Sequence, residues 1–74
     1  MIIVSQDKNT IVNFNTISEI YKSGKQILCA FPYIENYIDT LGTYTTEERA
    51  KEVLLEIKGN WEMRKDLAYY MPKE

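Results

Sequence analysis

Few side chains in this sequence are suited to catalysis. The chain has 74 residues with one cysteine, Cys29, and no histidine, so the commonest general base near neutral pH is missing. Cys29 lies inside the apolar run 26–31, whereas a nucleophilic cysteine needs an electropositive, partly exposed setting. Carboxylate pairs occur at Glu47–Glu48 and at Glu48 and Glu52, and we interpret them as a solvated helix face, because raising a carboxyl pKa requires burial. We therefore expect a protein that is not an enzyme and uses no cofactor or metal.

The better candidates are arginine and tyrosine side chains, and they indicate binding. Arg49 is predicted in the first turn of a helix, where a cation opposes the helix dipole, so it is a candidate for contacting an anion. The alternative is that its stem packs on Tyr44. Tyrosine covers apolar surface and still hydrogen-bonds, and the chain has six of them, some on predicted loops or ends that fit sheet-edge packing equally well. The candidate binding residues are Arg49, Tyr44, Tyr37, Tyr33, Tyr69 and Tyr70.

The elements that must position these residues begin with short strands. Runs rich in β-branched and aromatic residues alternate with turn-forming residues throughout the first half of the chain. Pro32 should end one strand, and Gly42 within another indicates a bulge or a close approach of the backbone. The segment 17–21 has helical spacing but is too short for a stable helix, so a kinked strand is preferred. The predicted strands cover residues 2–4, 10–14, 17–21, 26–31 and 37–44.

A helix is predicted over residues 46–58, with continuation to about residue 66. Thr45 and Glu48 have the spacing of a capping box. One apolar stripe runs along the helix, and Gly59 costs only about 1 kcal/mol. The stripe consists of Ala50, Val53, Leu54, Ile57 and Trp61. We expect Trp61, Phe14 and Phe31 in the core, and residues 67–72 as a terminal strand or arm.

These elements predict one α+β domain over residues 1–74. Its antiparallel meander of about five strands packs against one amphipathic C-terminal helix, followed by the short terminal strand or arm. A core this small is usually supported by association, so we expect a homo-oligomer. The net charge of -2 and the pI near 5.1 disfavour direct nucleic-acid binding. The sequence shows neither a signal peptide nor a run long enough for a membrane span, so we expect no membrane contact and a cytoplasmic location.

Three blocks of the sequence resemble a family of small uncharacterised proteins of Firmicutes and their phages and prophages. They are Ser5-Gln6-Asp7-Lys8 near the start, residues 41–54 (LGTYTTEERAKEVL) in the centre and Tyr70-Met71-Pro72-Lys73-Glu74 at the end. The sequence departs from fuller members in its middle and in residues 59–68, which are shortened. The resemblance brings no catalytic residues with it. It implies an accessory protein of a mobile element.

The resemblance implies three functions of different kinds. The leading hypothesis is a counter-defence or host-takeover protein that binds and inhibits a host bacterial protein through its tyrosine-rich edge. The second is an oligomeric sponge for a nucleotide immune signal, with Arg49 on a phosphate and a tyrosine stacked on the base. The third is a structural module that assembles with itself. The acidic pI favours the first, because a phosphate binder needs positive potential.

Overall fold

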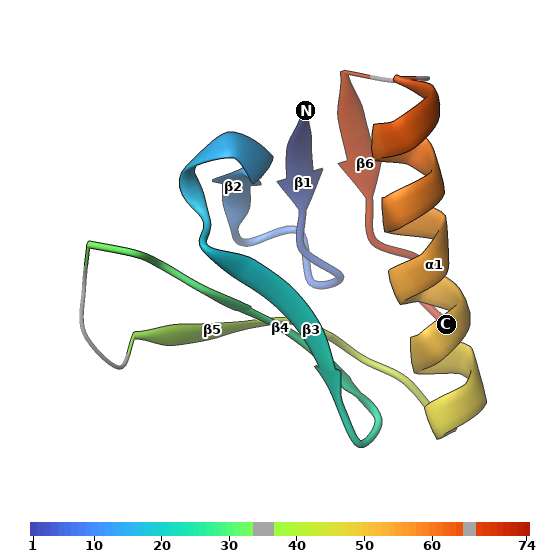
Figure 1. Cartoon of the computed structure of the whole chain (residues 1–74). Helices are drawn as coiled ribbons and strands as arrows, with labels where there is room; N and C mark the ends of the chain where they lie inside the picture. Colours follow the sequence, from blue (N-terminus) through green and yellow to red (C-terminus); the bar gives the residue numbers. More distant parts are fainter. Residues whose placement is uncertain (34–36, 65–66) are drawn as a thin grey trace.

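The α+β class, the single C-terminal helix and the short terminal strand are confirmed (Figure 1). The computed structural model describes residues 1–33, 37–64 and 67–74, and within them the chain forms six strands, one 3-10 turn and one α-helix. In chain order these are β1 (Ile2–Val4), β2 (Ile11–Asn13), η1 (Phe14–Thr16), β3 (Glu19–Ser23), β4 (Gln26–Ala30), β5 (Ile38–Thr43), α1 (Glu47–Met63) and β6 (Ala68–Tyr70).

The strands form two sheets, so the prediction of one continuous meander is wrong. The first sheet has the order β2-β1-β6 and the second has the order β3-β4-β5. The chain leaves the first sheet through η1, which is stabilised locally. Asn13 Oδ1 accepts a hydrogen bond from the backbone N–H of Asn15 at 2.9 Å, and Thr16 Oγ1 donates to the carbonyl of Asn13 at 2.9 Å. These bonds turn the backbone out of the ladder, and β3 starts a new sheet.

The terminal strand β6 pairs with β1, the first strand of the chain. The two strands are parallel, with Ile3 opposite Tyr69. Parallel neighbours need a long crossover connection, and here the second sheet and α1 lie between them in the sequence. Backbone hydrogen bonds from Ile2 to Leu67 and from Met71 to Val4 extend the pairing at both ends. The terminal arm is therefore integrated into its own chain.

The second sheet confirms both predictions for Gly42. The ladder between β4 and β5 shifts register between Ile27 and Leu28, and Gly42 faces Ile27 at the shift. A Cβ at Gly42 would lie 3.0 Å from Tyr44 Oη, which is a close approach of backbone to side chain. The β3–β4 hairpin turns at Gly24, whose φ of +60° is the left-handed conformation that glycine adopts readily.

The helix begins one residue later than the predicted capping box. Its N-cap is Thr46, whose Oγ1 accepts from the backbone N–H of Arg49 at 3.0 Å, so the Thr45 and Glu48 pair is wrong as a capping box. The helix passes Gly59, as predicted, and ends at Met63 with Arg64 in the left-handed conformation. The predicted continuation to residue 66 falls partly on residues 65–66, which are outside the described residues.

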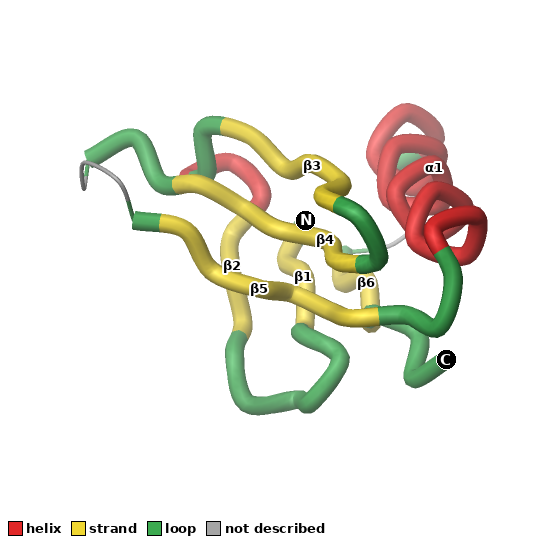
Figure 2. The backbone as a smooth tube through the Cα atoms, turned by 90° about the horizontal axis from the view of Figure 1, so that it is seen from below, coloured by secondary structure: helices red, strands yellow, loops and turns green. Residues whose placement is uncertain are grey.

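The core lies between the two sheets and one face of α1 (Figure 2). Its largest fully buried side chains come from β1, β4, β5 and α1. The expectation that Trp61 is a core residue is wrong, because 48% of its surface is exposed. Phe14 and Phe31 are only partly buried and pack against the outside of the core. The fully buried set is Ile3, Ile27, Cys29, Leu41, Val53 and Ile57.

Candidate functional site

The six predicted binding residues do not form one site. Tyr44, Arg49 and Tyr69 gather where β5, α1 and β6 meet. Tyr33 and Tyr37 lie on the β4–β5 connection, at the end of the molecule opposite the helix (Figures 1 and 2). Tyr70 is exposed on β6. Each group is described separately below.

The first group ties the terminal strand to the rest of the fold. Tyr44 is buried, and its Oη donates to the carbonyl oxygen of Pro72 at 2.9 Å. Tyr69 Oη donates to Glu56 Oε1 at 2.9 Å. Burial raises the pKa of Tyr44 to about 12, and burial together with the hydrogen bond to Glu56 raises the pKa of Tyr69. Both hydroxyls stay protonated at neutral pH and act as donors, so neither is a general base there.

Arg49 interacts within the chain. Its Nε donates to the main-chain oxygen of Glu74 at 2.9 Å, and its Nη1 lies 3.5 Å from Glu52 Oε1 and 3.9 Å from Glu56 Oε2. Its guanidinium carbon is 6.0 Å from the centroid of the Tyr44 ring, at the outer limit of a cation–π contact. The carboxylates one and two turns along the helix offset a cation that the dipole disfavours. An anion at Arg49 would have to compete with both.

The second group is part of an aromatic tip, which we define as Phe31, Pro32, Tyr33, Tyr37 and Ile38. Tyr33 is 90% exposed, and Tyr37 and Ile38 are also exposed. The rings of Phe31 and Tyr37 meet edge to face, with centroids 5.3 Å apart. This contact fixes the base of the tip. These five residues carry no charged side chain, and three of them, Tyr33, Tyr37 and Ile38, are large exposed apolar residues.

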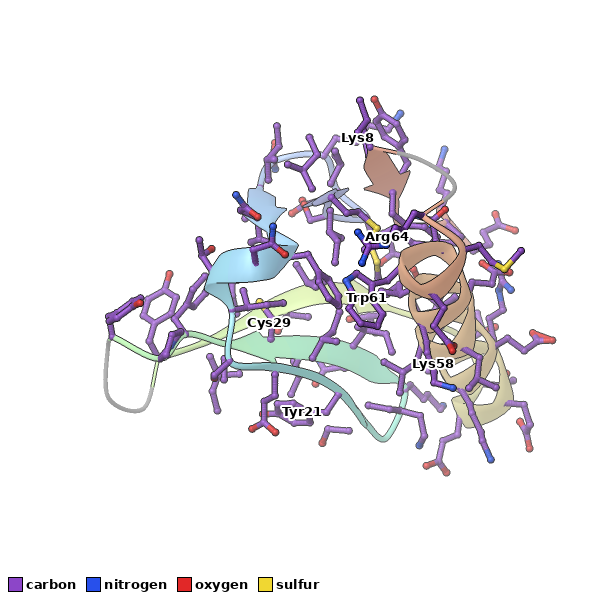
Figure 3. All side chains as sticks on the ribbon, turned by 45° about the horizontal axis from the view of Figure 1, so that its top comes forward. Lys8, Tyr21, Cys29, Lys58, Trp61 and Arg64 are labelled. Atoms are coloured by element: carbon purple, nitrogen blue, oxygen red, sulfur yellow. The ribbon has the colours of Figure 1, made fainter. Side chains whose placement is uncertain are left out.

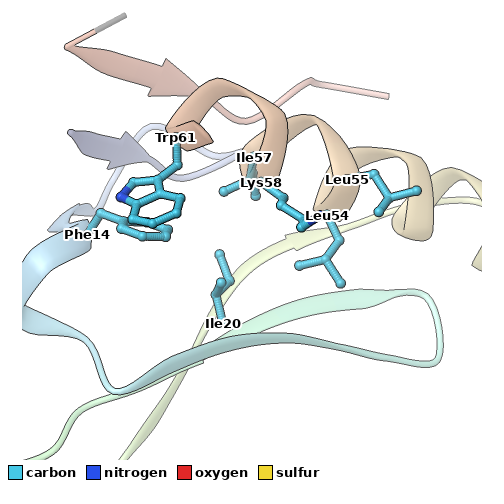
Figure 4. Close-up of a pocket in the computed structure, with 7 residues that line it drawn as sticks. All are labelled: Phe14, Ile20, Leu54, Leu55, Ile57, Lys58 and Trp61. Atoms are coloured by element: carbon cyan, nitrogen blue, oxygen red, sulfur yellow. The ribbon is translucent and has the colours of Figure 1, made fainter. Parts of the chain in front are cut away.

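An apolar groove lies along the helix, on the flank that faces β3 and η1 (Figure 4). Its cavity volume is about 310 Å³. Trp61 stacks on Phe14 at one end, with ring centroids 6.1 Å apart, and Ile20 of β3 forms the opposite wall. Lys58 lies on this same side of the helix (Figure 3). The groove residues are Phe14, Ile20, Leu54, Leu55, Ile57, Lys58 and Trp61.

Sequence reasoning missed this groove. The apolar stripe predicted that Trp61 points into the core. In the structure the indole instead stacks on Phe14 of η1 and remains about half exposed. The signal in the sequence was Leu55, an apolar residue outside the stripe. It is 55% exposed at the groove margin.

Tyr70 borders an open cleft with two lysines. The cleft, of about 610 Å³, lies between the β1–β2 turn and the segment after β6, and Lys8 and Lys73 line it. Asp7 also lines it, but its carboxylate accepts hydrogen bonds from Ser5 Oγ at 2.6 Å and from the backbone N–H of Asn9 at 2.9 Å. These bonds lower the pKa of Asp7, so it remains an anion beside the two lysines.

Cys29 lies in the core and has no exposed surface. Burial and the nearby charge of Asp39 raise the pKa of its thiol, which disfavours the reactive thiolate. In residues 1–33, 37–64 and 67–74, no three His, Cys, Asp or Glu side chains gather in a way that could hold a metal ion. Within the same residues, no helix has the length and apolar character to cross a membrane.

Comparison with known proteins gave no match among family models, curated proteins or solved structures. The resemblance to phage and prophage proteins therefore stays a prediction from the three sequence blocks.

Proposed function

We propose that this chain is a non-catalytic binding protein whose aromatic tip contacts the surface of a host bacterial protein. One observation carries the proposal: Tyr33, which follows β4, is 90% exposed, and Tyr37 and Ile38 at the start of β5 are exposed as well. Exposed rings contribute little to the folding stability of a chain with so small a core, and exposed apolar groups often mark an interaction site. Tyrosine side chains at such a position are typical anchors of protein interfaces.

The chemistry of the tip favours a protein over a polyanion. The described tip residues are aromatic, aliphatic or proline, and the two tyrosine hydroxyls supply hydrogen bonds. A nucleic-acid backbone would find no cation among them, whereas an apolar protein surface with carbonyl acceptors would match both rings and hydroxyls. Inhibition of the host protein by covering its surface is the role that the resemblance to phage accessory proteins implies.

The test compares two tyrosine truncations. Wild-type chain captures its target from host lysate, and the target is then purified and its affinity measured by calorimetry. Tyr33→Ala should weaken binding by about thirtyfold, the effect of removing an interface anchor worth about 2 kcal/mol. Tyr70→Ala is the matched control, because Tyr70 is 67% exposed on a different surface and should bind like wild type. The proposal is contradicted if the target binds Tyr33→Ala with the same affinity as Tyr70→Ala. It is also contradicted if wild type captures no protein from the lysate.

A second candidate function is sequestration of a nucleotide signal in the cleft of Lys8, Lys73 and Tyr70. Two lysines and an exposed ring in one cleft supply charge for a phosphate and a face for a base. This cleft suits a nucleotide better than Arg49, whose guanidinium already contacts two carboxylates. A thermal-shift panel of cyclic nucleotides tests it: a rise in Tm that Lys8→Ala and Tyr70→Ala abolish supports the sponge, and no shift with any nucleotide rejects it.

A further inference from the structure

The groove along α1 is a surface that the proposed function does not use. It lies on the helix, whereas the tip lies at the opposite end of the molecule (Figures 1 and 4). Its lining is apolar apart from the amine of Lys58. Trp61 and Leu55 are each about half exposed at its margin. Two observations indicate which partner covers the groove. They are the total accessible surface of the chain and the charges on the same flank of the helix.

The chain exposes more surface than a compact monomer of its size. Its accessible surface is 5227 Å². A monomer of 8.7 kDa is expected to expose about 4,700 Å². The excess of about 500 Å² approaches the roughly 800 Å² that each partner buries in a standard protein interface. An interface of modest size on each chain would remove this excess.

The charges on the groove flank complement those of an identical helix running the other way. Lys51, Leu55, Lys58 and Glu62 follow one another at intervals of three or four residues, so they share one flank of α1. Lysine stands at the N-terminal end of this row and glutamate at the C-terminal end. When two copies run antiparallel about a two-fold axis near residues 56–57, Lys51 faces Glu62 of the partner subunit, and the symmetry repeats the pair. A parallel arrangement would set Lys51 against its own equivalent.

The free chain leaves these groups available. Among the described residues, Lys51 forms no ion pair. Glu62 pairs with Lys58 at 3.2 Å in an exposed i,i+4 contact that stabilises the helix by only about 0.3–0.5 kcal/mol. Leu55 projects beside the groove, so the same two-fold axis that pairs the charges carries Leu55 of each chain toward the groove of the other.

We propose that a second copy of this chain occupies the groove, with its α1 antiparallel. In this register its Leu55 lies opposite Lys58 and packs into the groove beside Trp61. The dimer buries Leu55 and the exposed half of Trp61, and it places two Lys51–Glu62 pairs at its margins. The interface is isologous, as in most homodimers. It holds whether or not the aromatic tip binds a host protein, because the two surfaces share no residue.

Sedimentation equilibrium of the full chain tests the proposal. Wild type should have twice the 8.7 kDa chain mass at high concentration, and Leu55→Asp should be monomeric. Met63→Asp is the matched control: it puts the same charge on an exposed residue of the same helix, outside the groove, and should stay dimeric. Circular dichroism checks that both variants keep the helix. A monomeric wild type overturns the proposal, and so does a dimer that survives Leu55→Asp.

Charge reversal tests the antiparallel orientation. Lys51→Glu should weaken dimerisation by about three- to thirtyfold, because two exposed pairs are lost. The double variant Lys51→Glu/Glu62→Lys should recover most of that loss. If the loss of dimerisation free energy in the double variant equals the sum of the losses in the two single variants, the helices are not antiparallel in this register.

Trp61 fluorescence provides a readout that needs no variant. Trp61 is the single tryptophan of the chain and is half exposed in the protomer. Its emission should move to shorter wavelength as the wild-type concentration rises through the dissociation constant. If the emission wavelength stays constant while the mass doubles, the interface does not include Trp61, and the proposal is wrong.

Discussion

Gly42→Ala is the substitution whose effect follows most directly from the geometry. A Cβ at Gly42 would lie 3.0 Å from Tyr44 Oη, 3.1 Å from Tyr44 Cε2 and 3.2 Å from Met71 Cε. The methionine end can move, but the tyrosine ring is buried and its hydroxyl is bonded to Pro72 at 2.9 Å. Overpacking of this kind costs about 1–3 kcal/mol. We expect about 2 kcal/mol out of a total stability of about 4–11 kcal/mol for a chain of this length.

The assay is thermal and urea unfolding followed by circular dichroism. A loss of about 2 kcal/mol should lower Tm by about 8–16 °C. Tyr44→Phe alone should cost about 1 kcal/mol, since it removes the hydrogen bond to Pro72. Because Tyr44→Phe also removes the nearest clashing atom, Gly42→Ala should cost about 1 kcal/mol less in that background than in wild type. Equal costs in both backgrounds would refute the reasoning, since the clash would then not involve the Tyr44 hydroxyl.

The other predictions use the same unfolding assays or thiol chemistry. Gly59→Ala should stabilise the chain by about 0.5–1 kcal/mol, because Gly59 is inside α1 with nothing within 4 Å of an added Cβ; a loss would mean that the helix does not continue there. Gly24→Ala, equally free of contacts, should instead destabilise by about 1–2 kcal/mol through its positive φ. Stability should fall as pH rises from 10 to 12, because folded Tyr44 keeps a proton that the unfolded chain releases, and Tyr44→Phe should flatten this slope. Cys29 should react with a thiol reagent only on the timescale of unfolding, and fast labelling of the folded chain would contradict its burial.

Local elements were predictable because their patterns are local. The buried positions Ala50, Val53 and Ile57 have helical spacing, and the helix that they predict is present. The hairpin turn at Gly24 and the close approach at Gly42 also follow from residue type. The capping residue was wrong by one position because Thr45 and Thr46 are neighbours of the same type. Only the backbone direction decides which hydroxyl reaches the N–H of Arg49.

Long-range pairing was not predictable in the same way. Nothing in the three residues of β6 identifies β1 as a parallel partner, since that pairing depends on where α1 returns the chain. The groove depends on the same geometry. Trp61 continues the apolar stripe in sequence, but its indole stacks on Phe14 and stays about half exposed instead of entering the core. For Arg49, the sequence identified a cation against the dipole, and the structure supplies Glu52 and Glu56 as its partners.

The two proposed surfaces are compatible because they share no residue. The tip alone offers five side chains, which cannot bury the roughly 800 Å² per partner of a standard interface. The proposed dimer through α1 would leave both tips outside its interface, so one assembly would present two identical contacts. Against a target that repeats its epitope within reach, the second contact becomes intramolecular, and avidity can exceed the affinity of one tip by about 10²–10⁴. If both proposals hold, self-association through the groove would let so small a chain turn a weak aromatic contact into effective inhibition.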